Sequence, residues 1–135
     1  MASAPEVLQL LDQQLEDYQA LHALAVEQRA CLEGEDLSQL QQVFARAHRL
    51  MERIGSRQGR LGGMDRTEGA VQERLARLRQ AIEEVEAARQ AGEGTARRML
   101  ARTRDELHRL GRGQRAARGY QAAPVARARL YDGVR

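Results

Sequence analysis

The feature that most constrains the fold is a long series of apolar residues at alternating three- and four-residue spacing. No proline interrupts the series between Pro5 and Pro124. Such spacing places the apolar side chains on one face of an α-helix. The composition is dominated by Leu, Ala, Glu, Gln and Arg, which are strong helix formers. The chain is therefore predicted to be all-α and to bury these faces against one another in a bundle.

Local signals predict a helical hairpin in the first half of the chain. Ser3 and Asp36 are each followed three residues later by Glu or Gln, which is the spacing of a capping box at a helix N-terminus. Gly34 suits the left-handed position that ends many helices. Because only Gly34 and Glu35 separate the two predicted helices, an antiparallel hairpin is expected.

Two further helices are predicted after a glycine-rich loop around residues 59–66. Asp65 with Glu68 predicts the start of the third helix, the segment 92–94 predicts its end, and Thr95 is expected to cap the fourth. The four predicted helices cover about residues 4–33, 37–58, 67–91, and 96–111 or slightly beyond. They are expected to form one domain over residues 1–118, an elongated antiparallel bundle or hairpin of three to four long helices. A flexible basic tail is expected at 119–135.

The second predicted helix carries the most regular apolar stripe. Its members are Leu37, Leu40, Phe44, Ala47, Met51, Ile54 and Leu61. A three-four register sustained over this length is typical of a helix that packs knobs-into-holes against a partner. The stripe is therefore expected to pack against a partner helix.

Charge is distributed unevenly along the chain. Residues 1–94 contain 11 Arg and 16 acidic residues, whereas residues 95–135 contain 11 Arg and three acidic residues. All 22 basic residues are Arg, which we attribute chiefly to a GC-rich genome. No aromatic residues alternate with the arginines of the fourth predicted helix, and no helix-turn-helix or zinc pattern is present, so the sequence argues against nucleic-acid binding. A solvated basic face is the simpler interpretation.

The sequence shows no catalytic or metal-binding pattern. His22, His48 and His108 fall on three different predicted helices, and none has a second His or Cys three or four residues away. Cys31 is the only cysteine and is expected to be a small, semi-buried apolar residue. The protein is therefore predicted to be a non-enzyme without cofactors.

Because the first residues form neither a signal peptide nor a membrane span, a cytoplasmic protein without membrane insertion is expected.

Residues 8–61 resemble the N-terminal half of FlgN-type flagellar export chaperones. In that family a long Leu- and Glu-rich helix leads through an L-x-x-G-D-L-x-x-L hinge into a second helix. The corresponding segment here is Leu32–Leu40, which reads LEGEDLSQL and contains one extra acidic residue. An Asn-containing stretch that is common in the last helix of the family is missing from this chain.

The resemblance implies a type III export chaperone. Proteins of this family bind the C-terminal helical segments of hook–filament junction proteins, prevent their premature assembly, and deliver them to the export gate and ATPase. Carried over by position, the partner-binding residues are Met99, Leu100, Thr103, Leu107, Leu110 and Tyr120. Spacing from Leu100 to Leu110 also suits recognition between amphipathic helices, although packing in a four-helix core would explain it equally well.

Two other classes of function are open at this point. The first is a structural coiled-coil or scaffold component of the export machinery, which predicts self-association through the stripe between Leu37 and Leu61. The second, less favoured, is an Arg-rich helical protein that binds nucleic acid, with an affinity that falls steeply with salt. A monomer or a weak homodimer is expected.

Overall fold

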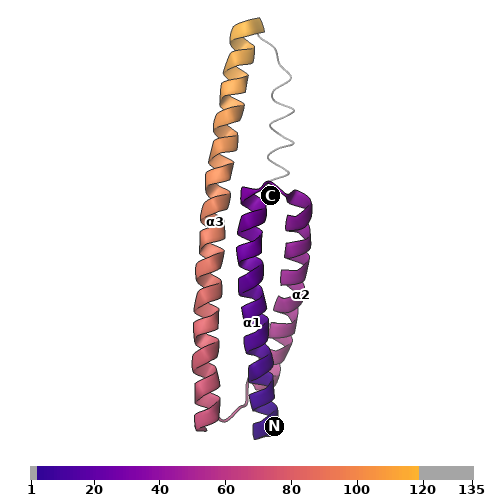
Figure 1. The fold of residues 1–135 in the computed structure, drawn as a ribbon, viewed down its shortest axis with the longest axis vertical. Helices are drawn as coiled ribbons and strands as arrows, with labels where there is room; N and C mark the ends of the chain where they lie inside the picture. The colour runs from indigo at the N-terminus through magenta and orange to yellow at the C-terminus, as the bar shows by residue number, and fades with distance from the viewer. Residues whose placement is uncertain (1–2, 119–135) are drawn as a thin grey trace. The chain divides into compact units, whose positions relative to one another are not determined.

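The fold is an all-α helical bundle, as predicted. The computed structural model describes residues 3–118, which form α1 (Ala4–Glu33), α2 (Leu37–Leu61) and α3 (Gly69–Arg118). Figure 1 shows α1 and α2 side by side and running in opposite directions, joined by the turn at residues 34–36. The predicted antiparallel hairpin is thus confirmed, whereas the predicted tail at 119–135 lies outside the described residues.

Side-chain caps begin the first two helices where the sequence predicts them. The Glu6 backbone N–H donates to Ser3 Oγ at 3.4 Å, and the Gln39 N–H donates to Asp36 Oδ1 at 3.1 Å. Each bond satisfies a backbone donor that has no partner within the helix. Because these caps depend only on residues within one turn, the starts of α1 and α2 follow directly from the sequence.

The turn between α1 and α2 places its left-handed residue one position later than predicted. Gly34 has a right-handed conformation with φ −86°, while Glu35 has φ 55°. The Asp36 N–H donates to the Cys31 carbonyl at 2.9 Å and the Glu35 N–H to the Leu32 carbonyl at 3.2 Å. This is the Schellman pattern, which puts the left-handed residue directly before the last donor. The left-handed position of the turn is therefore occupied by Glu35, although glycine would adopt this backbone conformation without strain.

Replacing Glu35 by glycine is expected to raise the free energy of unfolding by about 0.5–1 kcal/mol, because glycine adopts a positive φ without a Cβ clash. Urea denaturation followed by far-ultraviolet circular dichroism measures the change. Glu33→Gly is the matched control, since Glu33 lies in the last turn of α1 and glycine there lowers stability by up to about 1 kcal/mol. A loss of stability in both variants would contradict the prediction.

A single helix, α3, replaces the third and fourth predicted helices. The predicted break at 92–95 is wrong, because the helix continues through Gly92, Gly94 and Thr95. Each glycine costs only about 1 kcal/mol in a helix, and strong helix formers surround the segment on both sides.

The predicted cap by Asp65 is also wrong: Asp65 Oδ1 accepts hydrogen bonds from the Thr67 N–H at 2.9 Å and from Thr67 Oγ1 at 2.6 Å. It thereby closes a turn in the loop, and α3 begins later.

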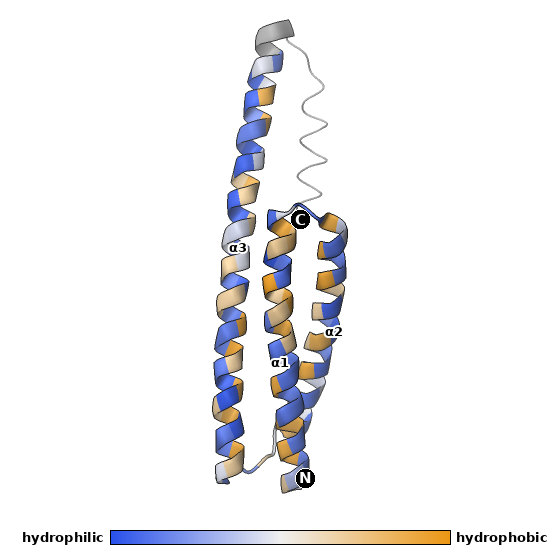
Figure 2. Ribbon diagram, viewed as in Figure 1, coloured by the Kyte–Doolittle hydropathy of each residue, from blue (hydrophilic) through white to orange (hydrophobic). Residues whose placement is uncertain are grey.

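The chain divides into two compact units, Met1–Glu93 and Gly94–Arg135. In the first unit, α1 packs against α2 and against the first part of α3 around two apolar clusters. The first cluster is built from Val7, Leu10, Leu11, Leu61 and Val71, and the second from Leu24, Cys31, Leu40 and Val43. Figure 2 shows apolar residues interspersed with polar ones along each helix, as expected of helices with one buried face.

In the second unit, the described residues are the continuation of α3 from Gly94 to Arg118. Leu110 on this segment has 62% of its surface exposed. None of the helices in the described part of the chain is both long enough and apolar enough to cross a membrane.

Candidate interaction surfaces

The face of α2 that packs on α1 is a seven-residue repeat that differs from the predicted stripe. It contains Leu40, Val43, Ala47, Leu50, Ile54, Arg57 and Leu61, which we call the inner seam. Leu40, Ile54 and Leu61 are buried as predicted. In contrast, Val43 is buried to 1% exposure although the prediction omitted it, and Phe44 beside it is exposed. The register that faces α1 is thus rotated from the predicted one.

A buried polar layer joins α1 to α2 at Arg57 of the inner seam. Arg57 Nη1 donates to Asp17 Oδ2 and to Gln14 Oε1, both at 2.8 Å. Gln14 Nε2 donates in turn to the Ile54 carbonyl at 3.1 Å, and Arg53 Nη2 donates to Asp17 Oδ1 at 3.1 Å. Gln14, Asp17 and Arg57 are 1%, 5% and 9% exposed, so these bonds are largely shielded from water.

This polar layer fixes the register of α2 against α1 within the hairpin. Sliding α2 along α1 by one turn would leave the Arg57 guanidinium and the Asp17 carboxylate without their partners, at a cost of several kcal/mol. Buried polar residues in helix seams are known to specify register in this way. The layer is fully hydrogen-bonded, and no buried side-chain N or O atom lacks a partner among the described residues. We therefore assign it to the architecture rather than to catalysis.

Three large apolar residues of α2 are exposed and lie seven residues apart. Leu37, Phe44 and Met51 have 69%, 49% and 59% of their surfaces exposed. Since seven residues are close to two helical turns, they form one line, which we call the outer stripe. Beyond them, a Cβ added at Gly55 would meet no atom within 4 Å, so the line continues into open space. These three residues of the predicted stripe are thus exposed and belong to neither apolar cluster.

The arginines of α2 lie on the side opposite the outer stripe. Arg46, Arg49, Arg53, Arg57 and Arg60 are the five arginines of this helix. At 3.6 residues per turn they fall within about 80° of the helix circumference, centred about 180° from the outer stripe. A bias in codon usage explains why the basic residues are Arg, but it does not explain why all five share one side.

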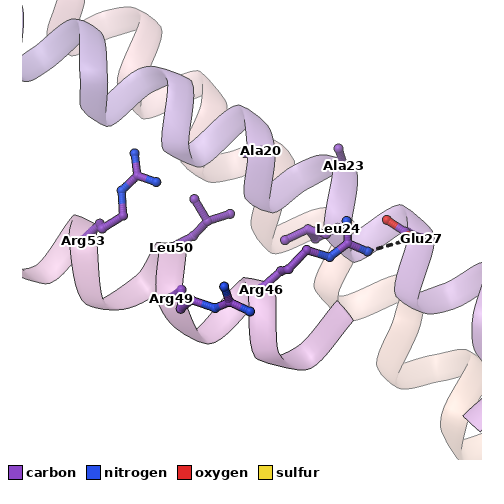
Figure 3. Close-up of a pocket in the computed structure, with 8 residues that line it drawn as sticks. All are labelled: Ala20, Ala23, Leu24, Glu27, Arg46, Arg49, Leu50 and Arg53. Atoms are coloured by element: carbon purple, nitrogen blue, oxygen red, sulfur yellow. Dashed lines mark hydrogen bonds and ion pairs between the residues drawn. The ribbon is translucent and has the colours of Figure 1, made fainter. Parts of the chain in front are cut away.

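A groove runs between α1 and α2 on this arginine side. It has a volume of about 430 Å³ and is lined by Ala20, Ala23, Leu24, Glu27, Arg46, Arg49, Leu50 and Arg53; we call it the arginine groove. Figure 3 shows the α1 residues on one wall and the three arginines on the other. Arg46 Nη2 donates to Glu27 Oε1 at 3.1 Å, and Gln39 Nε2 donates to the same oxygen at 2.9 Å.

Cys31 is buried in the second apolar cluster, more deeply than the semi-buried position that was predicted. Burial raises the pKa of its thiol, and the nearby carboxylates of Asp36 and Glu27 raise it further. Because Cys31 belongs to the second apolar cluster, its side chain contributes to the packing of α1 against α2. Of the predicted non-ligand histidines, His48 is exposed and contacts Glu52 Oε1 at 3.0 Å. No group of three His, Cys, Asp or Glu in the described residues could hold a metal ion.

The partner-binding residues implied by the resemblance fall on one face of α3. Met99, Leu100, Thr103 and Leu107 are half-buried, and Leu110 is exposed. Thr103 Oγ1 donates to the Met99 carbonyl at 3.0 Å, which satisfies the hydroxyl within the helix. Tyr120 lies outside the described residues. The arginine groove was not predicted from the sequence, although the one-sided placement of the α2 arginines was a usable signal. The sequence also did not separate the outer stripe from the inner seam.

Comparisons of the chain with protein-family models, with curated proteins and with solved structures find no match.

Proposed function

We propose that this protein binds an amphipathic helix of another protein along the outer stripe of α2. The observation that carries the proposal is the line of Leu37, Phe44 and Met51, about half or more exposed and free of arginine. Apolar residues that repeat every seven positions lie on one face of a helix, and such faces are the surfaces through which amphipathic helices pair. Aromatic and Met side chains are also enriched at such contacts.

Within this class, we propose a flagellar type III export chaperone that is not an enzyme. Its support is the resemblance of the Leu32–Leu40 hinge, which leads directly into the outer stripe. The partners would be C-terminal helical segments of hook–filament junction proteins, followed by the export gate and ATPase. The α3 residues implied by the resemblance, Leu100, Leu107 and Leu110 among them, would form a second binding element.

The test is a titration of the full chain with the C-terminal segment of a junction protein from the same genome. Binding is expected at or below tens of micromolar. A variant combining Leu37→Ser, Phe44→Ser and Met51→Ser is expected to weaken it about thirtyfold or more, since anchor residues carry most of the binding energy. Leu100→Ser with Leu107→Ser and Leu110→Ser is expected to weaken it about tenfold.

Circular dichroism of each variant shows whether the helices are retained. Absence of a complex at tens of micromolar would overturn the chaperone proposal. Unchanged affinity in the α2 variant would remove the outer stripe from the binding surface, and unchanged affinity in the α3 variant would remove the element derived from the resemblance.

The second candidate is a structural coiled-coil component that self-associates through the outer stripe. The seven-residue spacing of Leu37, Phe44 and Met51 favours it, because the same spacing forms the seam of a coiled coil. Sedimentation equilibrium separates the two candidates. A stable dimer that the α2 variant converts to monomer would favour the scaffold, and a strict monomer would remove it.

A further inference from the structure

We propose that the arginine groove is a second docking site, specific for an acidic amphipathic helix. This site is separate from the outer stripe, because the two lie on opposite sides of α2. Three observations carry the proposal: a central arginine that has no partner among the described residues, the spacing of the three arginines, and the small apolar floor between them.

The first observation is the charge balance of the groove. Arg46 is paired with Glu27, and Arg53 with Asp17, which does not line the groove. Arg49 lies between them and has no hydrogen bond or ion pair to any described residue. The contacts of Arg46 and Arg53 use only Nη2, and each guanidinium carries five N–H donors, so further donors remain. Within the described part of the chain, Arg49 therefore has no counter-charge, and Arg46 and Arg53 have spare donors on either side of it.

The second observation is the spacing of the arginines. Positions 46, 49 and 53 repeat at three and four residues, which sets the guanidinium groups in a row about 10 Å long along α2. A helix laid along the groove presents its own side chains at the same spacing. Carboxylates at i, i+4 and i+7 of such a helix would meet the three arginines in turn. An isolated anion could use only part of the row.

The third observation is the floor of the groove. Ala20 and Ala23 keep the α1 wall low, while Leu24 is 8% exposed and Leu50 is half-buried. A volume of about 430 Å³ accommodates a few side chains rather than a whole helix. A partner helix would thus rest on the rim and insert small or apolar side chains between its carboxylates. This requirement for an apolar face selects an amphipathic helix over a uniformly acidic segment.

The experiment uses the full chain and a fluorescently labelled synthetic peptide, with Glu at i, i+4 and i+7 over two repeats and Ala or Leu at the inward positions between them. Anisotropy at low salt is expected to give saturable binding at tens of micromolar. Arg49→Ala is expected to raise Kd roughly fivefold, and Ala23→Glu, which places a competing carboxylate on the exposed rim, roughly tenfold. Added salt is expected to weaken binding, since the contacts are near the surface.

Arg60→Ala is the matched control, because Arg60 is an exposed arginine of the same helix that does not line the groove. It is expected to change Kd by less than about twofold. An equal loss in Arg49→Ala and Arg60→Ala would overturn the proposal, as would equally tight binding of a peptide with the same composition and scrambled glutamates. Absence of saturable binding would also overturn it. The outer-stripe variant is expected to bind this peptide normally, so failure of the chaperone proposal and failure of this one are distinguishable.

Discussion

Asp17→Ala is expected to lower the free energy of unfolding by about 3 kcal/mol, because it leaves the buried Arg57 guanidinium without its counter-charge. Arg57 is 9% exposed and would keep only the Gln14 oxygen as a partner. Urea denaturation followed by circular dichroism measures the loss, and Asp17→Asn separates the loss of charge from the loss of side-chain volume. We expect Asp17→Asn to recover part of the stability, since an amide oxygen still accepts one hydrogen bond.

Arg53→Ala is the matched control for this prediction. Arg53 contacts the same carboxylate, but its side chain is 62% exposed, so its removal is expected to cost less than about 1 kcal/mol. Replacing the whole layer, as in Gln14→Leu with Asp17→Leu and Arg57→Leu, is expected to restore stability to within about 1 kcal/mol of the original, because no buried charge and no buried side-chain acceptor of the layer is left unpaired. If Asp17→Ala costs no more than Arg53→Ala, the layer is not a buried charge network.

The parts of the fold that could be predicted from the sequence depend on short-range chemistry. Ser3 and Asp36 cap their helices through donors three residues away, and the short connection between α1 and α2 admits only an antiparallel hairpin. The course of α3 could not be predicted in the same way. Glycine at 92 and 94 weakens the helix locally. The flanking residues favour its continuation, because they form ion pairs within the helix such as Arg89 to Glu86 at 3.1 Å.

The surfaces were harder to predict because α2 carries two overlapping heptad patterns. One pattern runs through Leu37, Phe44 and Met51, and the other through Leu40, Val43 and the rest of the inner seam. Counting apolar residues at three- and four-residue spacing combines the two patterns into one, since positions 37 and 40 are three residues apart and neighbours on the helix surface. Arg57 further obscures the inner seam, because a charged residue counts against burial unless its partners on α1 are known.

A pair of truncations on α2 tests directly which of these patterns faces α1. Leu40→Ala is expected to lower the free energy of unfolding by about 3 kcal/mol, because Leu40 is 8% exposed and its loss opens a cavity beside Val43. Leu37→Ala makes the same chemical change three residues away, where the side chain is 69% exposed. Its expected cost is less than about 0.5 kcal/mol. Urea denaturation measures both values, since a shift of the midpoint at an unchanged m-value reports a change in the free energy of unfolding.

The two truncations are expected to affect binding of the partner helix in the opposite order from their effects on stability. Leu37→Ala removes part of the outer stripe and should weaken capture of the partner helix severalfold, while Leu40→Ala leaves the stripe intact and should preserve the affinity of the folded fraction. If Leu37→Ala were instead the more destabilising change, α2 would be rotated from the orientation described here. Phe44 and Met51 would then belong to the core, and both proposed docking surfaces would lose their basis. The two leucines thus decide the register on which the functional proposals depend.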